Sequence, residues 1–254
     1  MKQTTGETYI MERNLTEGSI FKNIIYFSIP YLLAYFLQTL YGMADLFIIG
    51  QFEGVASTTA VSVGSQVMHM LTVMIVGLAM GATVNIGQAI GARDKKRAAV
   101  DTGNTATLFM MLSVILTVVL YFCVNGIVGI MSVPEEAAAG TAMYLKICFM
   151  GIPFITAYNI ISSIFRGMGD SKSPMYFIAI ACGVNIVLDY IFMGVLHLGP
   201  SGAALGTTLS QTVSVIVALT MFIRGKTGIT VKKDDFKPRK ETMGRLLKIG
   251  FPIA

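Results

Sequence analysis

Long apolar stretches without ionisable side chains constrain this chain more than any other feature. Apart from His69, no acid, base or histidine occurs between Gly54 and Ala92, and none occurs between Thr102 and Pro134. A run of about 18 apolar residues is long enough to cross a bilayer as a helix. Charged residues make up only 13% of the 254 residues, which is about half the fraction usual in soluble domains. The pattern predicts an all-α, polytopic membrane protein.

Six membrane spans are expected. They are residues 24–49, one span within 54–92, one from about 102 to 124, residues 137–165, and two spans in 173–223. The last two are divided at His197–Gly202, whose Gly and Pro residues are typical of a turn. The stretch 54–92 could almost form two short spans, so its length alone does not decide the count.

The basic residues favour a single span there. With one span, 18 of the 19 Lys and Arg residues fall on the side of the N-terminus, and Lys146 is the exception. Cytoplasmic loops carry such an excess of positive charge. We therefore expect a multi-pass protein of the cell membrane with its N-terminus in the cytoplasm. The surplus lies beside anionic lipid headgroups, so it does not indicate nucleic-acid binding.

The chain divides into four expected segments. Residues 1–23 form a cytoplasmic N-terminal segment, 24–223 a six-helix lobe and 224–248 a cytoplasmic linker. Residues 249–254 begin a second repeat, because Leu246–Pro252 resembles Ile24–Pro30 in placing a proline six residues after an aliphatic pair. Six spans return the chain to its starting side, so the repeat would be parallel, as in some secondary transporters. We expect a fragment of a longer chain, or a half-transporter that dimerises.

Polar residues in the first span share one helical face. Gln38, Tyr41 and Asp45 are separated by three and four residues, a spacing that puts them on one side of a helix. Ionisable groups inside a membrane are costly and indicate function. The alternative is that Asp45 lies at the interface and reaches water among the headgroups.

A second polar group is expected at similar depth. Asn185 and Asp189 are four residues apart in the fifth span, so their side chains adjoin. Thr207 follows the outer turn at the start of the sixth span, although a threonine hydroxyl commonly bonds only its own helix. One cavity could collect all these groups.

Other polar and small residues suggest packing. Gln66 and His69 share a helical face and are expected to form a buried, bonded pair rather than a proton relay. Gly77 and Gly81 form a small-residue surface of the kind on which helices pack. The three cysteines lie inside apolar runs without metal-ligand spacing.

Four ordered stretches resemble the multidrug and toxic compound extrusion transporters. They are Asp45 with Gln38 after Pro30, Gly87-Gln-Ala-Ile-Gly-Ala-Arg-Asp94, Phe165-Arg-Gly-Met-Gly-Asp170 with Pro174, and Gly202-Ala-Ala-Leu-Gly-Thr207. The resemblance implies one lobe of a two-lobe, twelve-helix antiporter that exports cationic organic compounds in exchange for Na⁺ or H⁺.

The resemblance also implies roles for single residues. Asp45, Asn185, Asp189 and Thr207 correspond to the family's cation site, where Na⁺ or a proton would bind, and Gln38 and Tyr41 correspond to cavity-lining positions. The implied partners are small organic cations, the bilayer and a C-terminal lobe. No cofactor is expected besides the coupling ion.

Two other classes remain open. A lipid-linked oligosaccharide flippase of the same superfamily would need several cationic residues in its cavity, and Lys146 is the only candidate. A noncatalytic membrane scaffold would not explain Asp189 deep in a span. An enzyme is not expected, because His69 has no acidic neighbour in the sequence.

Overall fold

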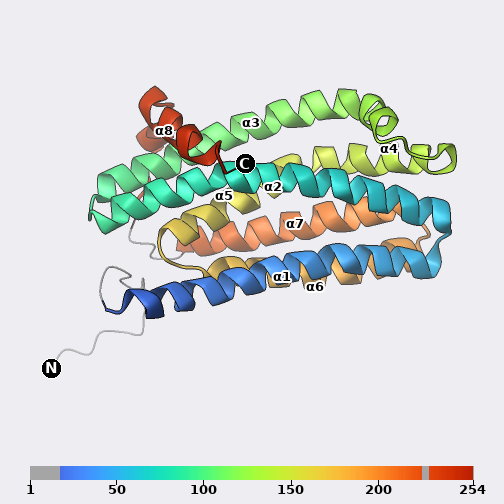
Figure 1. Ribbon diagram of the computed structural model, residues 1–254, viewed down its shortest axis with the longest axis horizontal. Coiled ribbons are helices and arrows are strands. Elements are labelled where there is room, and N and C mark those ends of the chain that lie inside the picture. The colour runs from blue at the N-terminus through green and yellow to red at the C-terminus, as the bar shows by residue number, and fades with distance from the viewer. Residues whose placement is uncertain (1–17, 225–228, 254) are drawn as a thin grey trace.

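A computed structural model describes residues 18–224 and 229–253, and this part of the chain is a bundle of long helices (Figure 1). The elements are α1 (Ile20–Phe52), α2 (Val55–Gly91), α3 (Lys95–Ile130), α4 (Glu135–Met150), α5 (Ile152–Gly167), α6 (Lys172–Asp189), the π-helix η1 (Tyr190–Val195), α7 (Gly199–Arg224), the 3₁₀ turn η2 (Lys233–Phe236) and α8 (Lys240–Gly250). Each helix bonds its own backbone groups, as an apolar environment requires.

The expected six spans are confirmed. Five helical segments are individually long and apolar enough to cross a membrane, and α4 and α5 together make a sixth that bends by 50°. The bend lies at Gly151, and Pro153 follows at the second position of α5, where it has no N–H with which to continue the hydrogen bonding of α4. Residues 55–91 form one helix, so the single-span interpretation of that stretch is correct.

The short connections place the chain's turns at two opposite ends of the bundle (Figure 1). At one end Arg93 takes a left-handed φ of 57° and the Asp94 carboxylate caps α3 by accepting from the Arg97 N–H at 2.9 Å. At the other end Ser132 and His197 each have a φ of 50°. The helices therefore alternate in direction, and the start of α1 lies at the same end as the α2–α3 turn.

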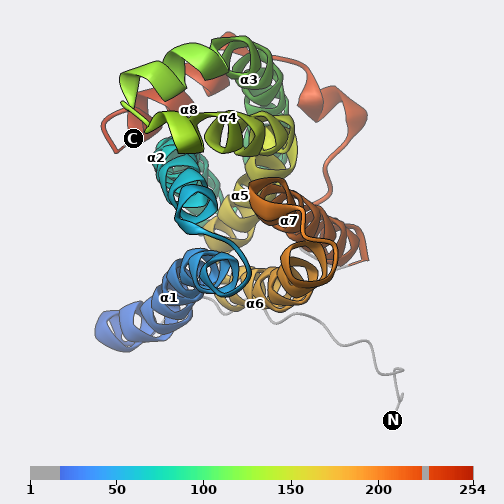
Figure 2. The ribbon, with the colours of Figure 1, turned by 90° about the vertical axis from the view of Figure 1, so that its right-hand side faces the viewer.

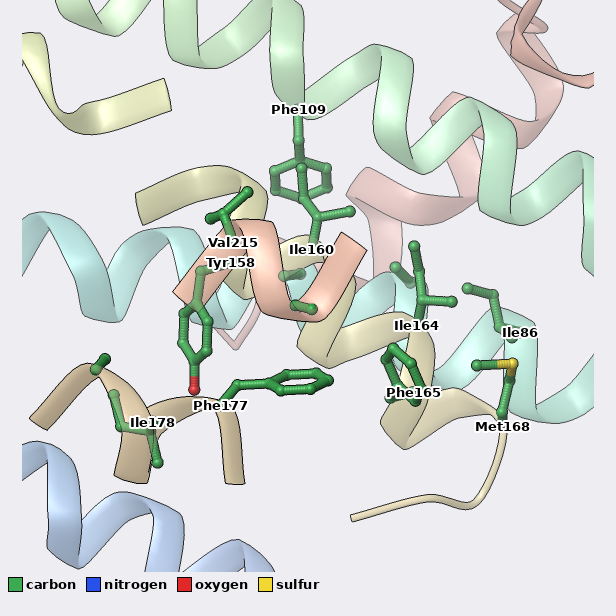
Figure 3. Packing of buried hydrophobic residues seen from close by; sticks show 14 of the residues in the cluster. Ile86, Phe109, Tyr158, Ile160, Ile164, Phe165, Met168, Phe177, Ile178 and Val215 are labelled. Atoms are coloured by element: carbon green, nitrogen blue, oxygen red, sulfur yellow. The ribbon is translucent and has the colours of Figure 1, made fainter. Parts of the chain in front are cut away.

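Helix α5 lies near the centre of the bundle, surrounded by α2, α3 and α7 (Figure 2). Around it one apolar cluster joins Phe109, Ile164, Phe165 and Phe177 (Figure 3). A second cluster, which includes Ile49 and residues of α4 and α7, fills the other half of the bundle. The fully buried Asp189 belongs to neither cluster.

The segment expected to be a linker packs closely on the bundle. Its helix α8 lies across α2, and Leu246 is buried in the apolar cluster around α5. A Cβ on Gly81 would overlap the Leu246 carbonyl oxygen, and one on Gly250 would overlap that of Leu78. Small residues thus let the two backbones touch. The expected packing surface at Gly81 is confirmed, and α8 is its partner.

Candidate functional site

The candidate site is a polar cluster that three helices build between the two apolar clusters. Asp45 comes from the last third of α1, Asn185 and Asp189 from the end of α6, and Thr207 from the first third of α7. The structure brings together the four residues that the sequence singled out as a cation site. Asp45 is 2% exposed and both α6 residues are fully buried. The interfacial alternative for Asp45 is therefore wrong.

Hydrogen bonds tie α1 to α7 at this cluster. The Thr207 hydroxyl donates to Asp45 Oδ2 at 3.2 Å, so it bonds more than its own helix. One turn earlier on α1, the Tyr41 hydroxyl lies 3.3 Å from both the Thr207 carbonyl oxygen and Ser210 Oγ. The Ser210 hydroxyl in turn donates to the Thr207 carbonyl at 2.9 Å. Sequence reasoning missed Ser210, since one serine in an apolar helix carries no distinctive signal.

The two carboxyl groups face each other, and the Asn185 amide lies beside them. Asp45 and Asp189 interact directly, and Asn185 interacts with both. These contacts lack good hydrogen-bond geometry, because Asp45 Oδ1, both Asp189 oxygens and both polar atoms of Asn185 are buried without a bonded partner. An unpaired buried polar group costs free energy, and a charged one costs much more. The cluster therefore offers unpaired oxygen atoms to a further ligand.

The arrangement is suited to a small cation or a proton. Two carboxylates, an amide oxygen and a hydroxyl offer the oxygen ligands that hard cations prefer. In the described residues no group of three or more His, Cys, Asp and Glu side chains is placed to hold a metal ion. A set made only of oxygen atoms does not suit the softer transition metals, which prefer sulfur and imidazole ligands.

Two features of the backbone place Asp189, and sequence reasoning overlooked both. A Cβ on Gly206 would overlap Asp189 Oδ1, so glycine at this position lets α7 approach the carboxylate. The π-helix η1 begins at Tyr190, directly after Asp189. Such π segments are frequent at functional sites. The signal for Gly206 was present in the Gly202–Thr207 stretch, but its physical role depends on a neighbour in another helix.

A narrow polar cavity extends from the cluster along α1. Its first part has a volume of about 110 Å³ and is lined by residues including Gln38, Tyr41, Asp45 and His69. An adjoining part of about 130 Å³ shares Gln38 and His69 and ends beside Arg166. Gln38 and Tyr41, expected from the family resemblance to line a cavity, both lie on its wall.

Some polar residues lie elsewhere than expected. Gln66 and His69 are both exposed and do not bond each other, so the expected buried pair is wrong. Gln66 lines an apolar pocket between α2, α3 and α4 instead. Lys146 lines neither part of the polar cavity, whereas Arg166 does and also stacks 5.4 Å from the centre of the Tyr31 ring. The α-helical spacing of Gln66 and His69 could not show which neighbours each would meet.

The MatE family model matches residues 30–191. The chain is 30% identical over 241 residues to the probable multidrug resistance protein YpnP of Bacillus subtilis, covering 95% of this chain and 54% of that protein. It is 27% identical over 236 residues to the multidrug export protein MepA of Staphylococcus haemolyticus, covering 93% and 52%. A solved structure described as the outward-facing conformation of a multidrug resistance MATE family transporter superposes with a TM-score of 0.89 at 30% identity, covering 97% and 55%. The chain thus spans about half the length of these relatives.

Proposed function

The chain belongs to the MatE family of multidrug efflux transporters, and we propose that it carries the cation-coupling site of an antiporter that exports cationic organic compounds in exchange for Na⁺ or H⁺. The observation that carries this proposal is the buried pair Asp45 and Asp189 with its unpaired oxygens. The relatives are transporters rather than enzymes, and the cluster is proposed to bind and release an ion rather than to catalyse a reaction.

The coupling follows from electrostatics inside a low-dielectric bundle. Two carboxylates about 4 Å apart repel each other by about 4 kcal/mol at an effective dielectric constant near 20. A proton shared by the pair, or a Na⁺ between the two groups, removes that repulsion. Because Asp45 belongs to α1 and Asp189 to α6, loss of the cation drives the two helices apart. Occupancy of the site thereby biases α1 between two positions, as differential affinity requires.

The transported compound competes for the same negative charge. Gln38 and Tyr41 line the cavity beside Asp45, so an organic cation in this space would lie close to the carboxylate. A cavity of this size cannot hold the coupling ion and a second cation together without repulsion. Entry of one therefore favours release of the other, and the ion gradient supplies the work of export.

We further propose that the end carrying the α2–α3 turn faces the cytoplasm, and that the protein resides in the plasma membrane. The basic residues at this end include Arg93, Lys95, Lys96 and Arg97, and positive charge marks the cytoplasmic side. We also propose that a second six-helix lobe completes the transport path, since the relatives are about twice as long and related transporters bind substrate between repeats.

The oligosaccharide flippase is the less favoured alternative. Such a protein needs several cationic side chains to bind a lipid-linked pyrophosphate. In this chain Arg166 lines the polar cavity, and Lys146 does not. A scaffold is also less favoured, because it would gain nothing from the unpaired oxygens of Asp45 and Asp189.

The decisive experiment replaces Asp189 by Asn in the natural full-length protein. The change is nearly isosteric and removes one of the two buried charges, so we expect loss of ion-coupled export with normal membrane insertion. Efflux of a fluorescent organic cation from cells, driven in turn by a Na⁺ and a pH gradient, measures the effect.

The matched control is Glu53→Gln, which neutralises an acid at the same end of α1 outside the cluster. Export by this variant should match the wild type. Wild-type export by a well-expressed Asp189→Asn variant would refute the proposal. Equal loss in both variants would also count against it, because the effect would then not belong to the cluster.

A further inference from the structure

A second charged pocket lies at the basic end of the bundle, away from the Asp45–Asp189 cluster. It occupies about 560 Å³ between the first turns of α3 and of α8. Its cationic lining residues are Lys96, Arg97, Arg239, Lys240 and Arg245, and its acidic ones are Asp94, Asp101 and Glu241. The pocket therefore has an excess of positive charge.

Two of the acids are already engaged within the protein. Asp94 caps α3 through the Arg97 N–H at 2.9 Å. The buried Asp101 carboxylate lies 3.6 Å from Arg97 Nε and 3.5 Å from Arg245 Nη2, distances too long for hydrogen bonds. Asp101 thus holds Arg97 and Arg245 in place at the floor of the pocket.

Three cations remain without a carboxylate partner. Lys96, Arg239 and Lys240 form no ion pair with any described residue, and all three are exposed at the pocket's rim. In addition, the Arg239 side chain does not cap the eleven-residue helix α8, which begins at Lys240 and has Glu241 in its first turn. The free N–H groups of a helix's first turn favour an anion. Cations from two helices and these N–H groups converge on one space.

The pocket keeps its shape because the chain before α8 is fastened to α3. Asn104 accepts from the Arg239 N–H at 2.7 Å and donates to the Asp235 carbonyl oxygen at 3.0 Å. The Thr107 hydroxyl donates to the Phe236 carbonyl oxygen at 2.8 Å. The wall that carries Arg239 and Lys240 is therefore held in place by specific hydrogen bonds.

We propose that this pocket binds a phosphate group, supplied by the headgroup of an acidic phospholipid in the adjacent leaflet or by a soluble phosphate ester. Its volume accommodates a phosphorylated headgroup, and basic pockets between helices at a membrane surface recognise such groups. A bound phosphate bridges Lys96 on α3 and Lys240 on α8. It thereby strengthens the attachment of α8 to the bundle, and the lipid composition of that leaflet regulates how firmly the segment after α7 is held. The proposal goes beyond the coupling function and does not depend on it.

The test uses the natural full-length protein in detergent, titrated with phosphatidylglycerol or phosphatidylcholine while its thermal unfolding is followed. The wild type should be stabilised by phosphatidylglycerol in preference to phosphatidylcholine. Lys96→Gln with Lys240→Gln should raise the phosphatidylglycerol concentration at half-effect about 25-fold, because each lysine near an anionic surface contributes about a fivefold effect. Glycerol 3-phosphate is titrated in parallel. Stabilisation by this soluble ester identifies a soluble source, and stabilisation by the lipid alone identifies the membrane.

The matched control is Lys233→Gln with Lys248→Gln, which removes the same charge from the same segment outside the pocket. It should shift the half-effect concentration less than twofold. Equal shifts in the two double variants would overturn the proposal. So would a wild-type protein that neither phosphatidylglycerol, relative to phosphatidylcholine, nor glycerol 3-phosphate stabilises. If the Lys96 and Lys240 variant does not fold, Arg239→Gln alone should give about a fivefold shift, and an unchanged titration would overturn the proposal.

Discussion

Replacing Gly206 by alanine tests whether close contact between α6 and α7 builds the proposed cation site. The added Cβ would overlap Asp189 Oδ1 and lie 3.5 Å from the Asn185 amide nitrogen, while every charge is retained. Asp189 must then move or α7 must shift outward. Because the Asp189 carboxylate is displaced, we expect cation affinity to fall by at least tenfold, as when a supporting residue around a metal site is lost.

The effect on stability is expected to be smaller than the effect on binding. Overpacking a buried site costs about 1–3 kcal/mol, and alanine regains about 1 kcal/mol of helix propensity over glycine. The net destabilisation is therefore about 0–2 kcal/mol. Gly183→Ala is the matched control on α6, because a Cβ there meets nothing within 4 Å. It should gain stability and leave binding unchanged.

The assay compares thermal unfolding of the purified full-length variants in Na⁺ and in choline, at several pH values, with efflux measured in cells. The wild type and Gly183→Ala should show stabilisation by the coupling cation, and Gly206→Ala should lose most of it. Wild-type cation dependence in a folded Gly206→Ala protein would refute the reasoning, since the site would then not require the contact between α7 and Asp189.

Three further predictions follow from the same structure. Asp45→Asn should abolish coupled export as completely as Asp189→Asn does, because Asp45 is buried and bonded to Thr207; export at half the wild-type rate or more would contradict this. Lys233→Cys, in a background without the three native cysteines, should resist an impermeant thiol reagent in intact cells and react after permeabilisation; labelling from outside would reverse the proposed topology. Asn104→Ala should remove the two side-chain hydrogen bonds that hold residues 235–239 to α3. The local stability of this segment should fall by about 1–3 kcal/mol, and proteolysis there should become faster. An unchanged cleavage rate would argue against that attachment.

Much of the fold could be predicted because lipid leaves a helix few alternatives. Every backbone N–H and C=O of a spanning segment must be bonded within it, so each long apolar run is expected to form a helix. From this requirement and the distribution of Lys and Arg we predicted one span within residues 54–92, and the structure has one helix there, at residues 55–91. We did not predict the break at Gly151, although Gly151 and Pro153 are a local signal for one.

The candidate site was predictable only in part. Helical spacing placed Gln38 with Asp45 and Asn185 with Asp189, because residues seven or four positions apart lie on one face of an α-helix. The same spacing failed for Gln66 and His69, which the packing of α2 separates into different pockets. A shared face is a property of one helix, whereas a shared environment depends on its neighbours.

The amino-acid sequence by itself determined the number of spans and which polar residues share a face of one helix, because both depend on local properties of the chain. Only the tertiary structure decided that Asp45 and Asp189 meet, that Gly206 leaves room for the meeting, and that α8 packs on α2 at Gly81. These facts depend on how closely separate helices approach one another. That approach is determined by side chains far apart in the sequence, through contacts that exist only when the whole bundle has assembled.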